Sequence, residues 1–240
     1  RPGSLSLPNN RRKFRSFESF VSGECNDLAV LAARQVAAVP GERYNPLFIH
    51  GGTGTGKTHL LEAIYTESRR QHSTKSVMYL NSEAFTNYFT SALASRTVPS
   101  FRQRFRNVDV LLIDNIEFLD NKRATQEEFL HTIVQVIEQG GQVVVSCDRH
   151  PRRLTKHREE LTTRFVSGLV CRIEAPDEAT RLKLVRSMVV GTKAVFSDDA
   201  IDYIVRRCRR NAREIQGAIN QLEGQFSLTG RRITLAVARE

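Results

Sequence analysis

One segment near the start of the chain restricts its fold more than any other. Residues 51–58 read GGTGTGKT, follow an apolar run over 46–50 and precede a stretch with helical periodicity. A glycine-rich loop of the form GxxxxGK[ST] between a strand and a helix is the P-loop, which wraps the phosphates of nucleotides. The segment therefore predicts an α/β fold that binds a nucleoside triphosphate, and an ordinary glycine turn is the alternative.

Each residue type in this loop has a chemical reason. Glycines let backbone N–H groups turn toward phosphate oxygens, Lys57 supplies a cation for the β and γ phosphates, and the Thr58 hydroxyl is a ligand for Mg²⁺. The helix that follows directs its positive dipole end at the same phosphates. We therefore expect ATP or ADP to contact Gly52, Thr53, Gly54, Thr55, Gly56, Lys57, Thr58 and His59.

A second aliphatic run ends in a carboxylate. Residues 110–114 read VLLID, which is typical of a parallel strand that is buried on both faces and faces the ligand at its carboxyl end. This Walker B pattern predicts that Asp114 reaches Mg²⁺ through water, beside Thr58. The alternative is a buried strand that ends in a solvated aspartate.

The chain is strongly basic. Its 240 residues carry a formal net charge of +10, which favours polyanionic partners, nucleic acid before acidic membrane surfaces. A solvated positive face is the alternative. The four cysteines form no C-x-x-C pair, so neither a zinc site nor a disulfide framework is predicted. The sequence shows no signal peptide and no apolar run of membrane-spanning length, so we expect a cytoplasmic protein.

Strand-like and helical stretches alternate along most of the chain. The strand-like runs cover 47–50, 76–80, 108–114, 142–148 and 169–174. This order predicts a parallel five-stranded sheet with helices on both faces, over residues 16–175. Asn26 is the expected N-cap of a first helix over 27–39.

The two ends of the chain differ from this pattern. Residues 1–15 lack apolar periodicity and are expected to form a basic linker tail. After residue 176 only helices are predicted, over 177–190, 197–209 and 211–228, with Asp177, Ser197 and Asn211 as caps. Residues 176–240 are therefore expected to form a small all-helical lid.

The wording of several motifs is specific to one family. A complete strand lies between the P-loop and the Walker B strand, which resembles the AAA+ branch of P-loop ATPases. Within that branch, residues 17–240 resemble the AAA+ domain of the bacterial replication initiator family, DnaA. The resemblance rests on YNPLFI at 44–49, RNVDVLLID at 106–114, TQEEF at 125–129, CDR at 147–149 and AREIQGA at 212–218.

The resemblance implies roles that the patterns alone do not. Asn26 would lie on the adenine side of the site, and Asp148 would occupy the sensor-1 position. Arg213, on the lid, would approach the γ-phosphate, and Arg164 would be the arginine finger that reaches the ATP of a neighbouring subunit. With Asp114 these residues form the catalytic set that the resemblance implies; without it, both arginines would be read as solvated helix residues.

The family also implies contact with DNA. An extra helical pair after the second strand would line a filament channel for single-stranded DNA, where arginines interleaved with aromatics over 101–106 could meet phosphates and bases. Phe85, Phe89 and Leu93 recur at helical spacing, which favours packing on the core for the aromatics. We therefore expect Thr90, Lys122 and Arg123 to face the strand.

Three departures from the family pattern limit these expectations. Asn115 follows the metal carboxylate where the family has a second acid, and an amide cannot accept a proton from attacking water. Hydrolysis is therefore expected to be weak or absent. Glu160 replaces an arginine near the finger, and a DNA-contacting arginine falls on Ala124, one residue after Arg123.

The expected function is an ATP-dependent initiator module that self-associates into an oligomer or filament and engages origin DNA, including single strands. Replication regulators and an acidic phospholipid surface are further expected partners. The chain is expected to stop before the family's helix-turn-helix domain. The alternatives are an Hda-type adaptor that binds other replication proteins, or an ATPase of the helicase-loader type.

Overall fold

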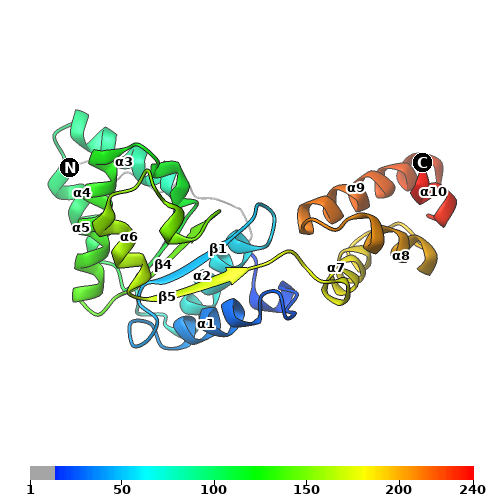
Figure 1. Ribbon diagram of the computed structural model, residues 1–240, viewed down its shortest axis with the longest axis horizontal. Helices are drawn as coiled ribbons and strands as arrows, with labels where there is room; N and C mark the ends of the chain where they lie inside the picture. The colour runs from blue at the N-terminus through cyan, green and yellow to red at the C-terminus, as the bar shows by residue number, and fades with distance from the viewer. Residues whose placement is uncertain (1–13) are drawn as a thin grey trace.

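The computed structural model describes residues 14–240, and a parallel five-stranded sheet forms its centre (Figure 1). The strands lie in the order β2-β3-β4-β1-β5, and each neighbouring pair is parallel. Their bounds are β1 Leu47–Gly51, β2 Val77–Asn81, β3 Val110–Asp114, β4 Gln142–Cys147 and β5 Leu169–Ile173. The predicted sheet is therefore confirmed, with ends that differ from the expected ones by at most two residues.

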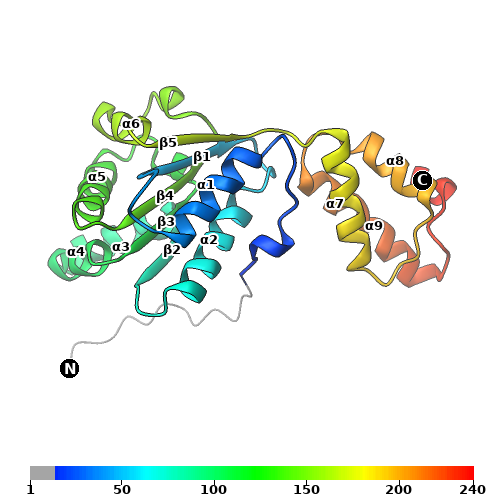
Figure 2. The ribbon, with the colours of Figure 1, turned by 90° about the horizontal axis from the view of Figure 1, so that it is seen from below.

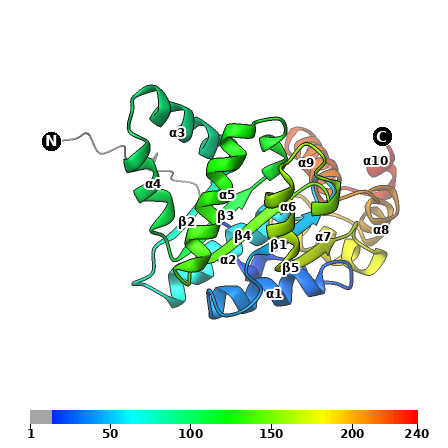
Figure 3. The ribbon, with the colours of Figure 1, turned by 60° about the vertical axis from the view of Figure 1, so that its left-hand side comes forward.

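Helices cover both faces of the sheet because its strands are apolar on both sides. In β1, Leu47 and Ile49 pack in the core under α1 (Asp27–Ala38) and α2 (Lys57–Gln71), whereas Phe48 packs in the opposite core (Figure 2). Helices α3 to α6 close that second core (Figure 3). Their bounds are α3 Ser82–Ala94, α4 Val98–Arg106, α5 Arg123–Glu138 and α6 Glu159–Val166.

Three short 3₁₀ helices lie in the connections of this region: η1 Phe17–Ser19, η2 Ile116–Leu119 and η3 Pro151–Arg153. The first precedes α1, and the other two follow the carboxyl ends of β3 and β4. In parallel sheets that edge carries the ligand, so η2 and η3 lie close to the region where the P-loop begins.

Only helices follow the sheet, and they have an apolar cluster of their own. It is built around Val185, Ile204, Ile215 and Ile219. The helices are α7 Glu178–Val190, α8 Asp198–Arg207, α9 Ala212–Thr229 and α10 Leu235–Arg239. They lie beyond the end of β5 toward which the strand points (Figure 1), and this arrangement is consistent with the expected helical lid.

The predicted caps are only partly correct. Asp177 and Asn211 accept hydrogen bonds from the backbone N–H groups of Thr180 (2.8 Å) and Glu214 (3.0 Å), as expected. Ser197 makes no such bond and contacts the Asp199 carboxylate. Asn26 stands at the first position before α1 but makes no side-chain cap, because its amide is used by the preceding loop.

Several other expectations are tested at the ends of the chain and on the helix surfaces. Leu93 was expected to repeat with two buried phenylalanines, yet it is 50% exposed at the end of α3.

Residues 1–13 of the predicted tail lie outside the described residues. Arg15 is described, and its guanidinium pairs with the buried Glu62 at 2.9 Å. Within 14–240, no helix has the length and apolar character needed to cross a membrane.

Candidate nucleotide site

The carboxyl end of the sheet, the P-loop and the lid helices border a cavity of about 540 Å³. Of the residues expected at a nucleotide, ten line it: Asn26, Thr53, Gly54, Thr55, Gly56, Lys57, Thr58, His59, Asp148 and Arg213. Gly52 and Asp114 do not line it, but Gly52 is the neighbour of Thr53 in the P-loop and Asp114 is hydrogen-bonded to Thr58. Residues from four separate parts of the chain therefore meet at the place where the sequence motifs predict phosphate.

The P-loop backbone takes a form that needs glycine. Gly54 and Gly56 have φ of +77° and +110°, where a side chain would be strained, and a Cβ on Gly56 would lie only 3.1 Å from the Phe20 ring. The Lys57 ammonium lies inside the loop and donates to the carbonyl oxygens of Gly51 (2.7 Å) and Gly52 (2.9 Å). Burial lowers the pKa of Lys57, and the nearby Glu117 and Asp114 carboxylates oppose that shift.

The two expected metal ligands are in direct contact. Asp114 is buried at the end of β3, and one of its carboxylate oxygens accepts a hydrogen bond from the Thr58 hydroxyl at 2.7 Å. The hydroxyls of Ser146 and Tyr79 also donate to this carboxylate. A carboxylate and a hydroxyl at the mouth of a phosphate-binding loop are the oxygen ligands that Mg²⁺ takes in nucleotide sites, so the residues fit the expected ion.

Three polar residues lie on the sheet side of the cavity. Asn115 has a left-handed backbone with φ of 58° and donates its N–H to Ser146 Oγ at 3.1 Å; the residue is exposed and lines the cavity. Burial raises the pKa of Glu117, whose carboxylate accepts from the Asp148 N–H at 3.3 Å. For Asp148, burial raises the pKa, but the hydrogen bond and charge of Arg149, with Cys147 and Lys57, together outweigh it, so the net shift is downward.

The lid reaches the P-loop directly. The Ala212 N–H at the start of α9 donates to the Gly54 carbonyl at 3.2 Å, and the next residue, Arg213, lines the cavity with an exposed guanidinium. Leu184 and Met188 of α7 give the same cavity an apolar side. The cavity thus has a polar end at the P-loop and an apolar part at α7.

Asn26 and His59 line the cavity with their side chains already engaged. The Asn26 amide accepts from the Gly23 N–H and donates to the Val21 carbonyl, both at 3.1 Å, and so shapes the loop before α1. The His59 ring nitrogen Nε2 lies 3.1 Å from both the Ser16 carbonyl and the Ser19 hydroxyl. Both residues therefore fix the N-terminal wall of the cavity.

The remaining predicted residues lie away from the cavity. Arg164 is half-buried on α6 and is not among the residues that line it; within 14–240 its Nε has no hydrogen-bond partner. Thr90 and Arg123 are exposed on α3 and α5. The Lys122 ammonium donates to the Phe118 carbonyl at 2.5 Å and lies 3.9 Å from the centre of the Phe118 ring.

Two of the three arginines over 101–106 pair with a carboxylate of α5, and their contact with DNA stays a prediction. Arg102 and Arg106 both pair with Glu128 of α5, at 2.8 and 2.7 Å, and Glu128 is buried. Arg104 lies against the Tyr88 ring. Phe101 and Phe105 are buried, and so are Phe85 and Phe89 as predicted. The pair α3–α4 is therefore fixed to the domain through α5.

Sequence reasoning missed two groups that hold the metal carboxylate, Ser146 and Tyr79. Ser146 is a polar residue in the otherwise apolar run over 143–147, and β3 and β4 are adjacent with Ile113 opposite Val145. A polar residue at the carboxyl end of a buried strand was the available signal. Tyr79 gives no such signal, because its ring packs like any other strand aromatic.

Comparison with known proteins identifies a family for this chain. The model of the bacterial DnaA ATPase domain matches residues 11–172. The chromosomal replication initiator protein DnaA of Thermomicrobium roseum is 41% identical over 225 residues, which cover 94% of this chain and 48% of that protein. The chain thus spans about half the length of that relative.

Solved structures agree with this match. Domain III of the Thermotoga maritima replication initiation protein DnaA is 37% identical, with a TM-score of 0.89 over 93% of both chains. A replication initiator DnaA bound to AMPPCP and single-stranded DNA is 32% identical, with a TM-score of 0.81 over 90% of this chain and 65% of that one.

Proposed function

The chain belongs to the bacterial DnaA family, and we propose that it is the ATP-binding, self-assembling module of a replication initiator that acts on origin DNA in the cytoplasm. Its fold, a five-stranded parallel sheet followed by helices, is the AAA+ fold of that family. The observation that carries the proposal is the P-loop cavity, where Lys57 and the Thr58–Asp114 pair face Arg213 of the lid.

We infer that ATP or ADP binds with its phosphates in the P-loop. Backbone N–H groups of residues 53–58 and the N-terminus of α2 would hold the phosphates, and Lys57 would neutralise their charge. Thr58 and Asp114 would hold Mg²⁺, which supplies further charge neutralisation. The apolar part of the cavity, with Leu184 and Met188, suits the adenine ring near Asn26.

The proposed assembly follows from the different positions of two arginines. Arg213 lines its own subunit's cavity, whereas Arg164 does not and can reach a nucleotide only in a neighbouring molecule. A guanidinium from outside neutralises charge on the γ-phosphate oxygens, so ATP in one subunit would stabilise contact with the next. Asp148 would sense the same phosphate from the sheet side.

We expect slow hydrolysis because Asn115 offers no base to the attacking water. Asn115→Asp should raise the single-turnover rate of ATP hydrolysis by about 100-fold, since a positioned general base contributes at least that much. Aspartate tolerates the left-handed backbone at 115 as asparagine does. The matched variant Glu117→Gln tests the other nearby carboxylate. If wild type hydrolyses ATP as fast as Asn115→Asp, and Glu117→Gln loses that activity, this assignment is contradicted.

We propose that single-stranded DNA binds along the exposed side of α3 and the start of α5. The DnaA structure with single-stranded DNA supports a strand as ligand for this chain. Removing Lys122 and Arg123 together should weaken binding of an oligonucleotide about tenfold at 0.1 M salt and flatten its salt dependence, because two phosphate contacts are lost. Titrations at several salt concentrations with ATP present measure both effects.

The control for that experiment removes the same charge elsewhere. Arg206 and Arg207 are exposed at the end of α8, so their double alanine variant keeps the overall charge matched. Equal loss of affinity in the two double variants would show that only net charge matters and would overturn the assignment. An Hda-type adaptor remains the alternative function, and regulators or acidic phospholipids remain proposed partners.

A further inference from the structure

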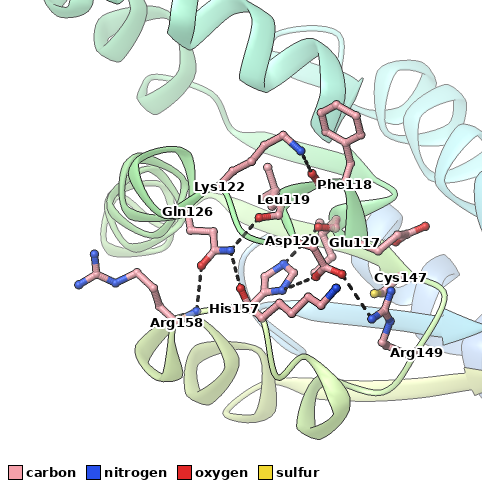
Figure 4. Close-up of polar contacts among 12 residues, drawn as sticks. Glu117, Phe118, Leu119, Asp120, Lys122, Gln126, Cys147, Arg149, His157 and Arg158 are labelled. Carbon is pink, nitrogen blue, oxygen red and sulfur yellow. Dashed lines mark hydrogen bonds and ion pairs between the residues drawn. The ribbon is translucent and has the colours of Figure 1, made fainter.

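A buried histidine joins two loops that follow the carboxyl ends of β3 and β4. The His157 side chain is fully buried and lies two residues before α6. Its Nδ1 is 3.1 Å from Asp120 Oδ1, and its Nε2 is 3.2 Å from the Ile116 carbonyl oxygen (Figure 4). The His157 ring therefore connects the segment before α6 to η2 and to Asp120, the residue that follows η2.

A continuous series of polar contacts runs from this histidine to the nucleotide cavity. The second oxygen of Asp120 lies 3.4 Å from an Arg149 nitrogen, and Arg149 Nε donates to Asp148 at 2.7 Å. Asp148 lines the cavity. Arg149 and Asp120, with side chains 34% and 20% exposed, thus connect the cavity-lining Asp148 to His157.

Gln126 fixes the same two segments by a separate route. It is buried, and its Nε2 donates to the carbonyls of Leu119 (2.7 Å) and Lys156 (3.0 Å). Its Oε1 accepts from the Arg158 N–H at 2.9 Å (Figure 4). The backbone on both sides of His157 is therefore attached to the loop that carries Lys122 and leads into α5.

The polar contacts of His157 do more than fill space. A neutral imidazole has one N–H for two facing acceptors. Nε2 is hydrogen-bonded to Ile116, whereas the Nδ1–Oδ1 approach does not have hydrogen-bond geometry, so Asp120 Oδ1 has no donor among the described residues. Burial lowers the pKa of His157, and Asp120 and the Ile116 carbonyl oppose that shift. An apolar side chain would fill the same space without this cost, so the polar contact contributes position more than stability.

We propose that Asp120 and His157 are positioning residues that link the Asp148–Arg149 segment at the nucleotide cavity to α6, the helix that carries Arg164. The finger then takes its position from the wall of its own subunit's nucleotide site. This inference rests on the ATP-dependent assembly proposed above, because it concerns where Arg164 is held.

The test uses Asp120→Asn, which keeps the size of the side chain but removes its charge, together with His157→Leu and the double variant. Each should bind Mg²⁺-ATP within about twofold of wild type, yet need about tenfold more protein to assemble in ATP, a typical size for coupling between sites. The double variant should show the same defect as either single variant, not their product, because the pair acts as one unit.

Asp109→Asn is the matched control. Asp109 also joins two loops, accepting from the Ser76 N–H (2.7 Å) and hydroxyl (2.9 Å), but at the end of the sheet away from the cavity. It should lower the Tm without changing the assembly threshold. If the Asp120 and His157 variants behave like this control, or lose assembly only in proportion to unfolded protein, the inference is wrong.

Wild type and Arg164→Ala, measured alongside, separate the two proposals. Wild-type assembly that Arg164→Ala abolishes and the junction variants leave unchanged overturns only the positioning role. Absence of wild-type assembly in ATP overturns the proposed function and this inference with it.

Discussion

Lys57→Ala is expected to weaken ATP binding by about 100-fold, close to 3 kcal/mol, while the fold stays intact. The Lys57 ammonium lies inside the P-loop on the carbonyls of Gly51 and Gly52, and its removal deletes the cation available to the β and γ phosphates. Its stem is not part of the apolar clusters under the sheet, so the Tm without nucleotide should change little. Equilibrium titration with a fluorescent ATP analogue measures the affinity.

Lys193→Ala is the control for that variant, because Lys193 is exposed after α7 and does not line the cavity. It should bind the analogue as wild type does. An unchanged affinity in Lys57→Ala, with the fold intact by circular dichroism, would contradict the assignment of the P-loop as the phosphate site.

Arg164→Ala is expected to retain ATP binding but to lose ATP-dependent assembly, with the threshold concentration raised by about 100-fold. Arg164 lies outside its own cavity, so intrasubunit affinity has no reason to fall. That change in threshold corresponds to about 2.7 kcal/mol, within the range of about 2 kcal/mol or more that buried interface arginines contribute. Sedimentation velocity over a concentration series in Mg²⁺-ATP measures it.

Arg70→Ala removes an exposed arginine on α2 whose partner is Glu67 of the same helix, and it should assemble normally. If Arg164→Ala instead binds ATP poorly as an isolated subunit, the arginine acts within its own site. That result would overturn the intersubunit role.

The parts of the site that lie within short motifs could be predicted from sequence. The P-loop and the Walker B strand each keep their own spacing, and parallel strands bring their carboxyl ends to one edge, so the contact of Thr58 with Asp114 follows from the pattern. The alternation of Leu47, Phe48 and Ile49 between two cores follows from the two-residue period of a strand.

Contacts between distant segments could not be predicted in this way. Arg102 and Arg106 resemble phosphate-binding residues in sequence, and only the packing of α4 on α5 brings the buried Glu128 to them. The His157 contact with Asp120 likewise joins residues far apart in the chain. No periodicity or spacing identifies such pairs, because each depends on how two loops meet.

The exposure of single residues could also not be predicted from the sequence. Leu93 follows Phe89 by four residues as Phe89 follows Phe85, but repeated steps of four drift away from one face of a 3.6-residue helix, and Ala92 takes the buried position instead. Asn26 has the residue type of a cap, but its amide bonds to the loop on its own N-terminal side. Local propensity predicts the helix, but tertiary packing determines which of its residues are buried and which partners they contact.

The most direct test of the central claim is sedimentation velocity of the unmodified chain in Mg²⁺-ATP, in Mg²⁺-ADP and without nucleotide, each with and without a single-stranded oligonucleotide. The structure predicts assembly in Mg²⁺-ATP, stronger with the oligonucleotide, and monomers in Mg²⁺-ADP, because only the γ-phosphate gives Arg164 of a neighbour a partner. A chain that stays monomeric under all conditions at high concentration, and binds no single strand at low salt, would contradict the initiator function and favour the adaptor.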